Sequence, residues 1–238
     1  MNRVYLDRAA AFCIGAIAAL AFSLTLLAGH AEDDAKAIEQ ARQSGISSAQ
    51  SAFGRSVPDR PISQGTYMPL YLQTDSQWSH VPYADGTVGD SGCGLVCAAM
   101  AVKYLTTQDV TPLQLAGTLG DSCLTDGVND PGKFCEWMAR AYPEYGIEFG
   151  AISYDLESAL SRVSDGWLAF AGMGGALGDN TYDGHVVLIW RADDAGYWLR
   201  DPASPGNSAR QFTTEELAAV DFRYFYTIRG GFYGNAGN

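Results

Sequence analysis

The chain has 238 residues, with 15 Lys and Arg side chains against 27 Asp and Glu and a formal net charge of −12. A chain this acidic, without a Lys/Arg cluster, lacks the phosphate-binding surface that nucleic-acid recognition needs, so we expect no nucleic-acid partner. Its 47% apolar content, 12% aromatic content and 27 glycines exclude a largely disordered chain, a collagen and a coiled coil.

The N-terminus resembles a membrane-directing segment. Residues 9–29 carry no charge, follow Arg3 and Arg8, and would span about 30 Å as a helix, roughly the thickness of a bilayer core. Positive charge before the segment and acidic charge after it predict export of the rest of the chain. Residues 1–31 are therefore either a signal peptide ending at Ala31 or an N-terminal membrane anchor. We expect an extracytoplasmic protein, secreted or anchored to the outer face of the cytoplasmic membrane, with no other membrane contact.

Three further regions follow this segment. Residues 32–66 start with acidic side chains and continue rich in Ser, Gly, Gln and Pro without periodicity, which is typical of a stalk or linker. Residues 67–230 form the predicted domain, which we expect to be a monomer, and residues 231–238 form a loose tail. Helical patterns come first in the domain and strand patterns later, which predicts an α+β fold.

The predicted elements of the domain follow from periodicity and from turn residues. In its first half we expect a strand at 67–73, a loop, an apolar helix at 93–105, a helix from 112 with Thr111 as its N-cap, a helix at 131–141 and a short amphipathic helix at 152–163. In its second half we expect a buried strand at 166–173, a mobile Gly-rich loop at 174–184, strands at 185–190 and 197–202 joined by a hairpin turn, a small helix at 213–220 and a last strand at 221–229.

The segment around Cys93 places a thiol in the first turn of the apolar helix. Asp90 or Ser91 is expected to cap this helix, and its first backbone N–H groups and its dipole stabilise a thiolate. Gly92 and Gly94 would leave the sulfur uncovered and let a substrate backbone come close. Cys93 is therefore a candidate nucleophile, and the alternative is a small residue buried at a helix start.

Two histidines remain beyond residues 1–31, namely His80 and His185. His80 lies in a polar loop, where an exposed imidazole without a special role is expected. His185 begins a buried strand, whose apolar residues would hold it rigidly at the edge of the core. His185 is thus the candidate general base for Cys93.

A hairpin between the strands at 185–190 and 197–202 suggests a third candidate. If these strands pair about Asp193, Asp201 lies directly opposite His185, and their Cβ atoms are roughly 4.5–5.5 Å apart. A carboxylate there could accept a hydrogen bond from one ring nitrogen and leave the other free. The alternative is that Asp201 only begins a turn before proline.

Attack on a carbonyl also requires donors for the developing oxyanion. The backbone N–H of Cys93 is one donor, and the side-chain amide of Gln73 is the candidate for the second, with Gln77 as the alternative. Trp78 and Gly184 are expected to line the substrate cleft. For Trp78 the alternative is a purely packing role.

The remaining cysteines are given no catalytic role. Cys97 falls on the apolar face of its helix and is expected in the core. Cys123 and Cys135 flank a loop rich in Gly, Asp and Asn, where a disulfide is permitted outside the cytoplasm; the alternative is two small apolar residues. Because there is no CxxC pair and histidine is scarce, we expect no metal and no cofactor.

Several segments together resemble the stand-alone peptidase C-39-like domains, namely YLQTDSQW, PYADGTVGDSGCGLVCAAMAVKYL, VTPLQLA, GHVVLIW and LRDPAS. That family is similar to the papain-like cysteine peptidases that cut bacteriocin leader peptides after double glycine. The resemblance covers about residues 66–228 and implies a papain-like α+β fold in which the nucleophile helix packs on an antiparallel sheet. It implies Cys93 as nucleophile, His185 as general base and acid, Asp201 as orienting carboxylate and Gln73 as oxyanion donor.

Two features differ from the transporter-linked leader peptidases. Gln73 stands 20 residues before Cys93, where those enzymes place a glutamine only a few residues before the cysteine, and no ATP-binding GxxxxGK[S/T] motif follows. Double-glycine specificity is therefore not implied. We expect an exported cysteine peptidase that acts on a peptide or protein, or on cell-wall peptide. The alternatives are an NlpC-type or amidase-type cell-wall hydrolase and a non-catalytic cell-surface binding module with the same fold.

Overall fold

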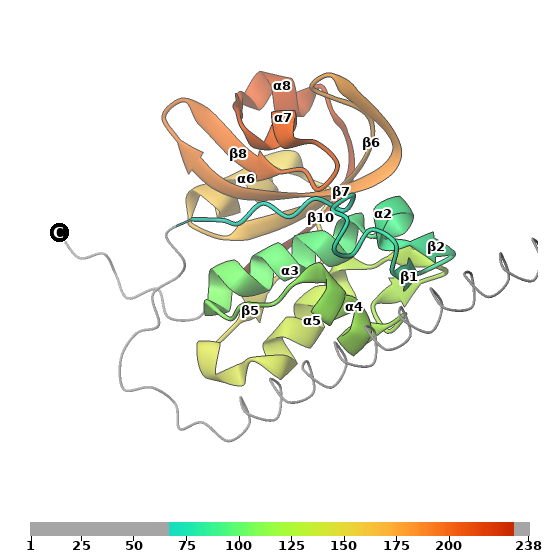
Figure 1. Ribbon diagram of the computed structural model, residues 1–238. Helices are drawn as coiled ribbons and strands as arrows, with labels where there is room; N and C mark the ends of the chain where they lie inside the picture. Colours follow the sequence, from blue (N-terminus) through green and yellow to red (C-terminus); the bar gives the residue numbers. More distant parts are fainter. Residues whose placement is uncertain (1–66, 231–238) are drawn as a thin grey trace, which may run out of the picture.

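The computed structural model describes residues 67–230, so the predictions for residues 1–31, 32–66 and 231–238 lie outside it. The described chain combines helices with an antiparallel sheet (Figure 1), which confirms the predicted mixture of helix and antiparallel sheet. Every helix within residues 67–230 falls short of the length and apolar character needed to cross a bilayer.

One helix begins at its predicted cap, and another begins at a cap that was not predicted. The hydroxyl of Thr111 accepts a hydrogen bond from the backbone N–H of Gln114, whose side chain binds back in a capping box. Asp130 caps the next helix, and Pro131 follows at its first position. The helices are α2 (Val88–Ser91), α3 (Cys93–Thr106), α4 (Pro112–Leu119), α5 (Pro131–Ala141), the 3-10 helix η1 (Pro143–Tyr145), α6 (Leu156–Ser164), α7 (Pro205–Ser208) and α8 (Thr214–Ala218).

Six strands form one sheet in the order β5-β10-β6-β7-β8-β9, and each neighbouring pair is antiparallel. Two small hairpins, β1–β2 and β3–β4, lie outside it. The strands are β1 (Pro82–Tyr83), β2 (Gly86–Thr87), β3 (Leu124–Thr125), β4 (Val128–Asn129), β5 (Glu148–Phe149), β6 (Leu168–Leu177), β7 (Asn180–Asp193), β8 (Gly196–Arg200), β9 (Gln211–Phe212) and β10 (Asp221–Arg229).

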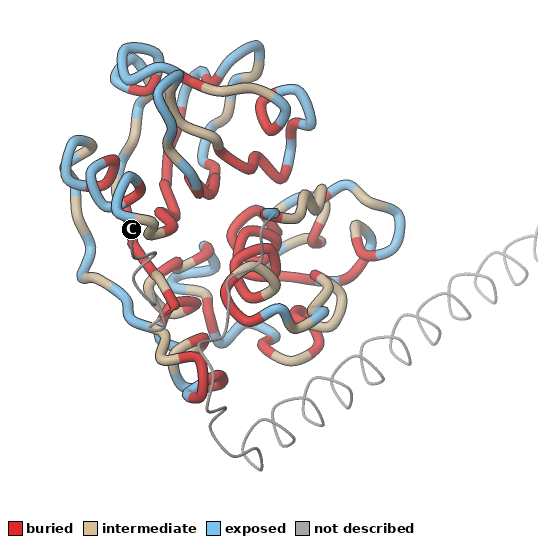
Figure 2. Tube along the Cα trace, turned by 90° about the vertical axis from the view of Figure 1, so that its left-hand side faces the viewer, coloured by how far each residue is buried: buried red, intermediate tan, exposed pale blue. Residues whose placement is uncertain are grey.

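The sheet separates two hydrophobic cores, because successive strand residues face opposite sides. In β7, Val186, Leu188 and Trp190 pack in the core that contains α3, whereas Val187 and Ile189 pack in the core that contains α6. Helix α3 lies between the sheet and helices α4 and α5 (Figure 1), and it is buried along almost its whole length (Figure 2). A helix that is apolar on all sides is stable in such a position.

The predicted strand at 67–73 does not form. The guanidinium of Arg200 donates to the carbonyl oxygen of Met68 at 2.9 Å, and the backbone N–H of Gln73 donates to the carbonyl of Pro202 at 2.8 Å. The segment is thus held by a side chain and by a turn instead of a strand ladder. It brings Gln73 next to the end of β8.

The Gly-rich stretch at 174–184, predicted as a loop, instead continues the β6–β7 hairpin. Ala176 pairs with Thr181 and Leu177 with Asn180, which leaves a two-residue turn. Gly178 begins this turn with a φ of +57°, a conformation that favours glycine. The glycines therefore shape a tight turn and a bulge in the strand pair, where the sequence had indicated irregular structure.

Candidate active site

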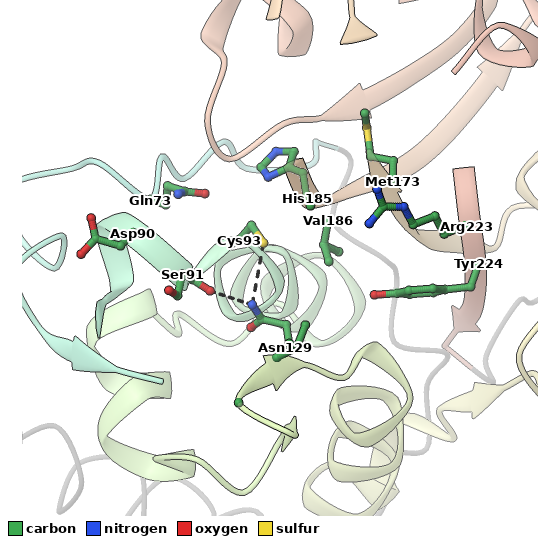
Figure 3. Close-up of a pocket in the computed structure, with 13 residues that line it drawn as sticks. Gln73, Asp90, Ser91, Cys93, Asn129, Met173, His185, Val186, Arg223 and Tyr224 are labelled. Atoms are coloured by element: carbon green, nitrogen blue, oxygen red, sulfur yellow. Dashed lines mark hydrogen bonds between the residues drawn. The ribbon is translucent and has the colours of Figure 1, made fainter. Parts of the chain in front are cut away.

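Cys93 is the first residue of α3 and lines a cavity of about 380 Å³ at the end of that helix (Figure 3). The predicted side-chain cap is absent, because Gly92 is the N-cap and Asp90 instead completes the capping box of α2 with Thr87. Backbone N–H groups in the first turn of a helix have no acceptor within the helix, and they carry the positive end of its dipole. The sulfur therefore lies where a negative charge is favoured.

His185 in β7 lies on the sheet side of Cys93 (Figure 3), and its Nε2 is 2.8 Å from Oδ1 of Asp201. Burial disfavours the charged ring. The hydrogen bonds to Asp201 and to Cys93, together with the charges of both, outweigh burial and raise the pKa of His185 to about 9. The arrangement favours a protonated imidazole between the Asp201 carboxylate and the sulfur of Cys93.

The Asp201 carboxylate accepts hydrogen bonds from four donors and has no exposed surface. Oδ1 accepts from His185 and from the backbone N–H of Ala203 at 2.9 Å; Oδ2 accepts from Tyr182 Oη and from Asn207 Nδ2, both at 2.8 Å. Burial alone would raise the pKa of Asp201, but the hydrogen bonds and the charge of His185 hold it below its usual value. The carboxylate is thus kept ionised in the interior.

The contact between His185 and Asp201 is present, but the predicted register is wrong. Asp193 pairs with Gly196 across a two-residue turn, and a bulge follows, so that Leu188 lies opposite Arg200. Asp201 lies just beyond the end of β8. Its own turn, closed by the N–H of Ala203, directs the carboxylate back towards the histidine. Asp201 therefore begins a turn and also contacts His185.

Tyr182 and Asn207 were not predicted as part of the site. The ring of Tyr182 stacks on that of His185 with a centroid distance of 4.1 Å and an interplanar angle of 12°. Asn207 lies in α7 and also donates to the carbonyl of Leu177 at 3.0 Å. Tyr182 stands three residues before His185 on the same strand, which is a weak signal, and the sequence contains no signal for Asn207.

Gln73 lines the cavity, whereas Gln77 is exposed and does not line it. The Nε2 atom of Gln73 donates to the carbonyl of Gly89 at 2.7 Å, which orients the amide. Within residues 67–230, its buried Oε1 has no hydrogen-bond partner. One N–H of the amide is therefore used by the protein itself, and the second is not.

Asn129, at the end of β4, approaches Cys93 from the side opposite His185 (Figure 3). Its Nδ2 is 3.7 Å from the sulfur of Cys93 and donates to the carbonyl of Ser91 at 2.6 Å. Its Oδ1 accepts from the hydroxyl of Tyr83 at 2.9 Å. Sequence reasoning missed Asn129 because an asparagine in a segment of Gly, Asp and Pro is typical of a turn.

Two glycines that were predicted beside the cleft, Gly92 and Gly94, have a different structural role. A Cβ atom on Gly92 would lie 2.5 Å from the carbonyl oxygen of Val88, so the tight α2–α3 junction requires glycine. A Cβ atom on Gly94 would lie 2.6 Å from Cβ of Asn129. Neither residue lines the cavity, and Gly94 makes room for a side chain of the protein rather than for a substrate.

The other two predicted cleft residues differ from each other. Gly184 lines the cavity. Trp78 is buried beside Tyr71, donates its Nε1–H to the carbonyl of Leu72 at 2.8 Å, and does not line the cavity. Trp78 therefore has a packing role.

Cys97 lies in the core, where its thiol donates to the carbonyl of Val186 at 3.4 Å, and burial raises its pKa well above the usual value. Of the two interpretations of Cys123 and Cys135, the structure shows two buried free thiols and no disulfide between them. Burial raises the pKa of both thiols and favours their protonated form. Within residues 67–230, no three His, Cys, Asp or Glu side chains are placed to share a metal ion.

Comparison with protein-family models finds no match, and comparison with curated proteins finds none either. Among solved structures, the chain is similar to a candidate C39-like peptidase from Bacillus anthracis. The TM-score is 0.41 at 15% sequence identity, and the alignment covers 70% of this chain and 98% of that one. The geometry around Cys93 is therefore the basis for assigning a function.

Proposed function

We propose that this protein is an exported cysteine peptidase with a papain-like, C-39-like fold. One observation carries the proposal: Cys93 and His185 line the same cavity, and the buried carboxylate of Asp201 is hydrogen-bonded to the His185 ring. Four hydrogen-bond donors keep that buried carboxylate charged against the cost of burial, and the imidazole is held between it and a thiol at a helix start. This is the arrangement that nucleophilic catalysis by a thiolate requires.

In the proposed acylation step, the Cys93 sulfur attacks the carbonyl carbon of the substrate peptide bond. The carbonyl oxygen becomes an oxyanion, which the backbone N–H of Cys93 and the free N–H of Gln73 stabilise. His185 then gives its proton to the leaving amine, the C–N bond breaks, and a thioester remains on the sulfur. The Asp201 carboxylate orients the ring and stabilises its positive charge throughout.

In the proposed deacylation step, water attacks the thioester carbonyl. His185, now neutral, takes a proton from the water, and the thiolate leaves as the C–S bond breaks. The proton on His185 restores the starting ion pair. Each bond that forms or breaks is accounted for by the peptide, one water molecule and these side chains, without a cofactor.

The proposed substrate is a peptide or protein outside the cytoplasm, and cell-wall peptide is the second class to test. Export is inferred from the uncharged segment at residues 9–29 and from the charges that flank it. Since residues 1–31 would direct the chain to the membrane, we place the domain of residues 67–230 on the extracytoplasmic side.

The test compares the full-length protein with its Cys93→Ser variant, under reducing conditions, on a peptide library and on peptidoglycan fragments. We expect cleaved peptides from the wild type only, detected by mass spectrometry. Products from peptidoglycan alone would instead indicate a wall hydrolase, and no products from either pool would indicate a binding module. The Cys135→Ser variant removes a buried thiol outside the site and serves as the control that keeps activity.

A second measurement needs no substrate. Iodoacetamide near pH 7 should alkylate Cys93 rapidly and Cys97 far more slowly, because only a thiolate reacts and Cys97 is fully buried. If Cys93 reacts as slowly as an ordinary thiol, whose pKa is about 8.5, the proposed ion pair does not exist.

A further inference from the structure

We propose that Asn129 is a further catalytic residue, whose amide N–H donates to the sulfur of Cys93, stabilises the thiolate and holds it facing His185. The inference rests on the proposed function, because it concerns the same nucleophile. It adds a donor on the side of the sulfur that neither His185 nor the helix start occupies (Figure 3).

The hydrogen bonds of Asn129 determine which end of its amide faces the sulfur. The hydroxyl of Tyr83 has one proton and donates it to Oδ1 at 2.9 Å, so the oxygen end is fixed. The Nδ2 end then has two N–H groups. One donates to the carbonyl of Ser91 at 2.6 Å, and the other is left for the sulfur of Cys93 at 3.7 Å.

The protonation state of Tyr83 supports this orientation. Burial, followed by the nearby charges of Cys123, Cys93 and Asp121, raises the pKa of Tyr83 far above its ordinary value of 10.0. The phenol therefore keeps its proton throughout the physiological range and always acts as a donor to Asn129. A flipped amide would place its N–H groups against that donor, which is unfavourable.

The surrounding backbone delivers Asn129 to this position. It is the buried residue of the β3–β4 hairpin, whose other residues are exposed or half-buried. Asp126 and Gly127 form the turn with φ values of 52° and 76°, as a tight two-residue hairpin requires. Gly94 of α3 has no side chain where Asn129 packs, since a Cβ atom there would be 2.6 Å from the Cβ of Asn129.

A donor in this position has a chemical use. A thiolate accepts an N–H bond more strongly than a neutral thiol or thioester does, because charge-assisted hydrogen bonds are the stronger ones. Asn129 should therefore favour the charged nucleophile before attack and the leaving thiolate during deacylation. The titratable groups His185, Tyr83, Cys97 and Tyr224 interact with Cys93, and Asn129 adds a neutral donor to them.

The test measures the alkylation of Cys93 by iodoacetamide between pH 5 and pH 9, with the labelled peptide quantified by mass spectrometry. The full-length wild type is compared with Asn129→Leu, which removes the donor at similar volume, and with Tyr83→Phe, which only removes the hydroxyl that fixes the amide. Thr125→Val is the control, since it removes a hydrogen bond to Asp130 near the same hairpin and leaves the amide in place.

We expect alkylation at pH 6 to slow about ten-fold in Asn129→Leu, the size that one hydrogen bond to a charged group implies, and about three-fold in Tyr83→Phe. The alkylation profile of both should move to higher pH, which a merely structural role would not cause. Thr125→Val should match the wild type. Circular dichroism identifies a variant that does not fold, and Tyr83→Phe then decides alone.

Two other results would overturn the inference in distinguishable ways. If Cys93 is alkylated rapidly in the wild type and equally rapidly in both variants, Asn129 has no role, while the proposed peptidase mechanism stands. If the wild type itself reacts only as an ordinary thiol, the proposed function fails as well, and the stabilisation of a thiolate by Asn129 fails with it.

Discussion

The sheet side and the helix side of the cavity hold their polar groups differently. On the sheet side, both oxygens of Asp201 have two donors each, and the ring of His185 is fixed between the carboxylate and the stacked Tyr182. On the helix side, Asn129 has partners at both ends of its amide, whereas Gln73 has a buried oxygen without one.

This difference fits a division of tasks. A buried carboxylate is costly unless its hydrogen bonds are complete, so the sheet side is closed around one permanent charge. In the proposed mechanism, the helix side faces a charge that appears and disappears on the sulfur and on the substrate oxygen. Donors there must be oriented yet keep an N–H group free, as Gln73 does with the amide held by Gly89.

The largest effect is expected from Asp201→Ala, which removes the centre of the sheet side. Four donors lose their acceptor and His185 loses its orienting charge, so kcat/KM should fall about 10³–10⁴-fold, as in other triads. The kcat/KM of Asp201→Asn, whose side chain has nearly the same volume, should fall almost as far. A loss below ten-fold, measured on a peptide identified in the library, would mean that the closed network serves only stability.

A smaller effect is expected from Gln73→Ala on the helix side. Loss of one oxyanion donor should lower kcat about 10²-fold, with little change in KM, because the interaction forms only in the transition state. Gln77→Ala, at an exposed position outside the cavity, is the matched control and should behave as wild type. Equal effects of the two substitutions would contradict an oxyanion role for Gln73.

The smallest effect is expected from a change of pH. It tests the sheet side of the cavity, where His185 titrates, without any mutation. Because the pKa of His185 is raised to about 9, kcat/KM should fall about ten-fold per pH unit above that value as the proton for the leaving amine is lost. The same shift stabilises the fold fully below the ordinary pKa of 6.5, and this stability is lost as pH rises through about 9. A pH-rate profile and thermal melts test both; an alkaline midpoint near 7 would contradict the tight pairing of His185 with Asp201.

Much of the fold was predictable because local signals act over few residues. The cap at Thr111 set the start of α4, and apolar runs identified α3 and β7. The prediction of a strand at 67–73 was wrong because the carbonyl of Met68 is bound by the side chain of Arg200, which is distant in sequence. The glycines at 174–184 were misread because glycine is typical of loops and of tight hairpins alike.

By itself the sequence determined which residues could do chemistry, because few cysteines and histidines lie beyond the N-terminal segment and one of each stood at the start of an apolar element. It also suggested Asp201 as the partner of His185, although through the wrong register. Only the tertiary structure decided that Asn129 meets the sulfur of Cys93 and that Gln73 lines the same cavity, since the two residues come from separate segments. Such contacts depend on how a hairpin and a loop pack on one helix end, and no local pattern records that packing.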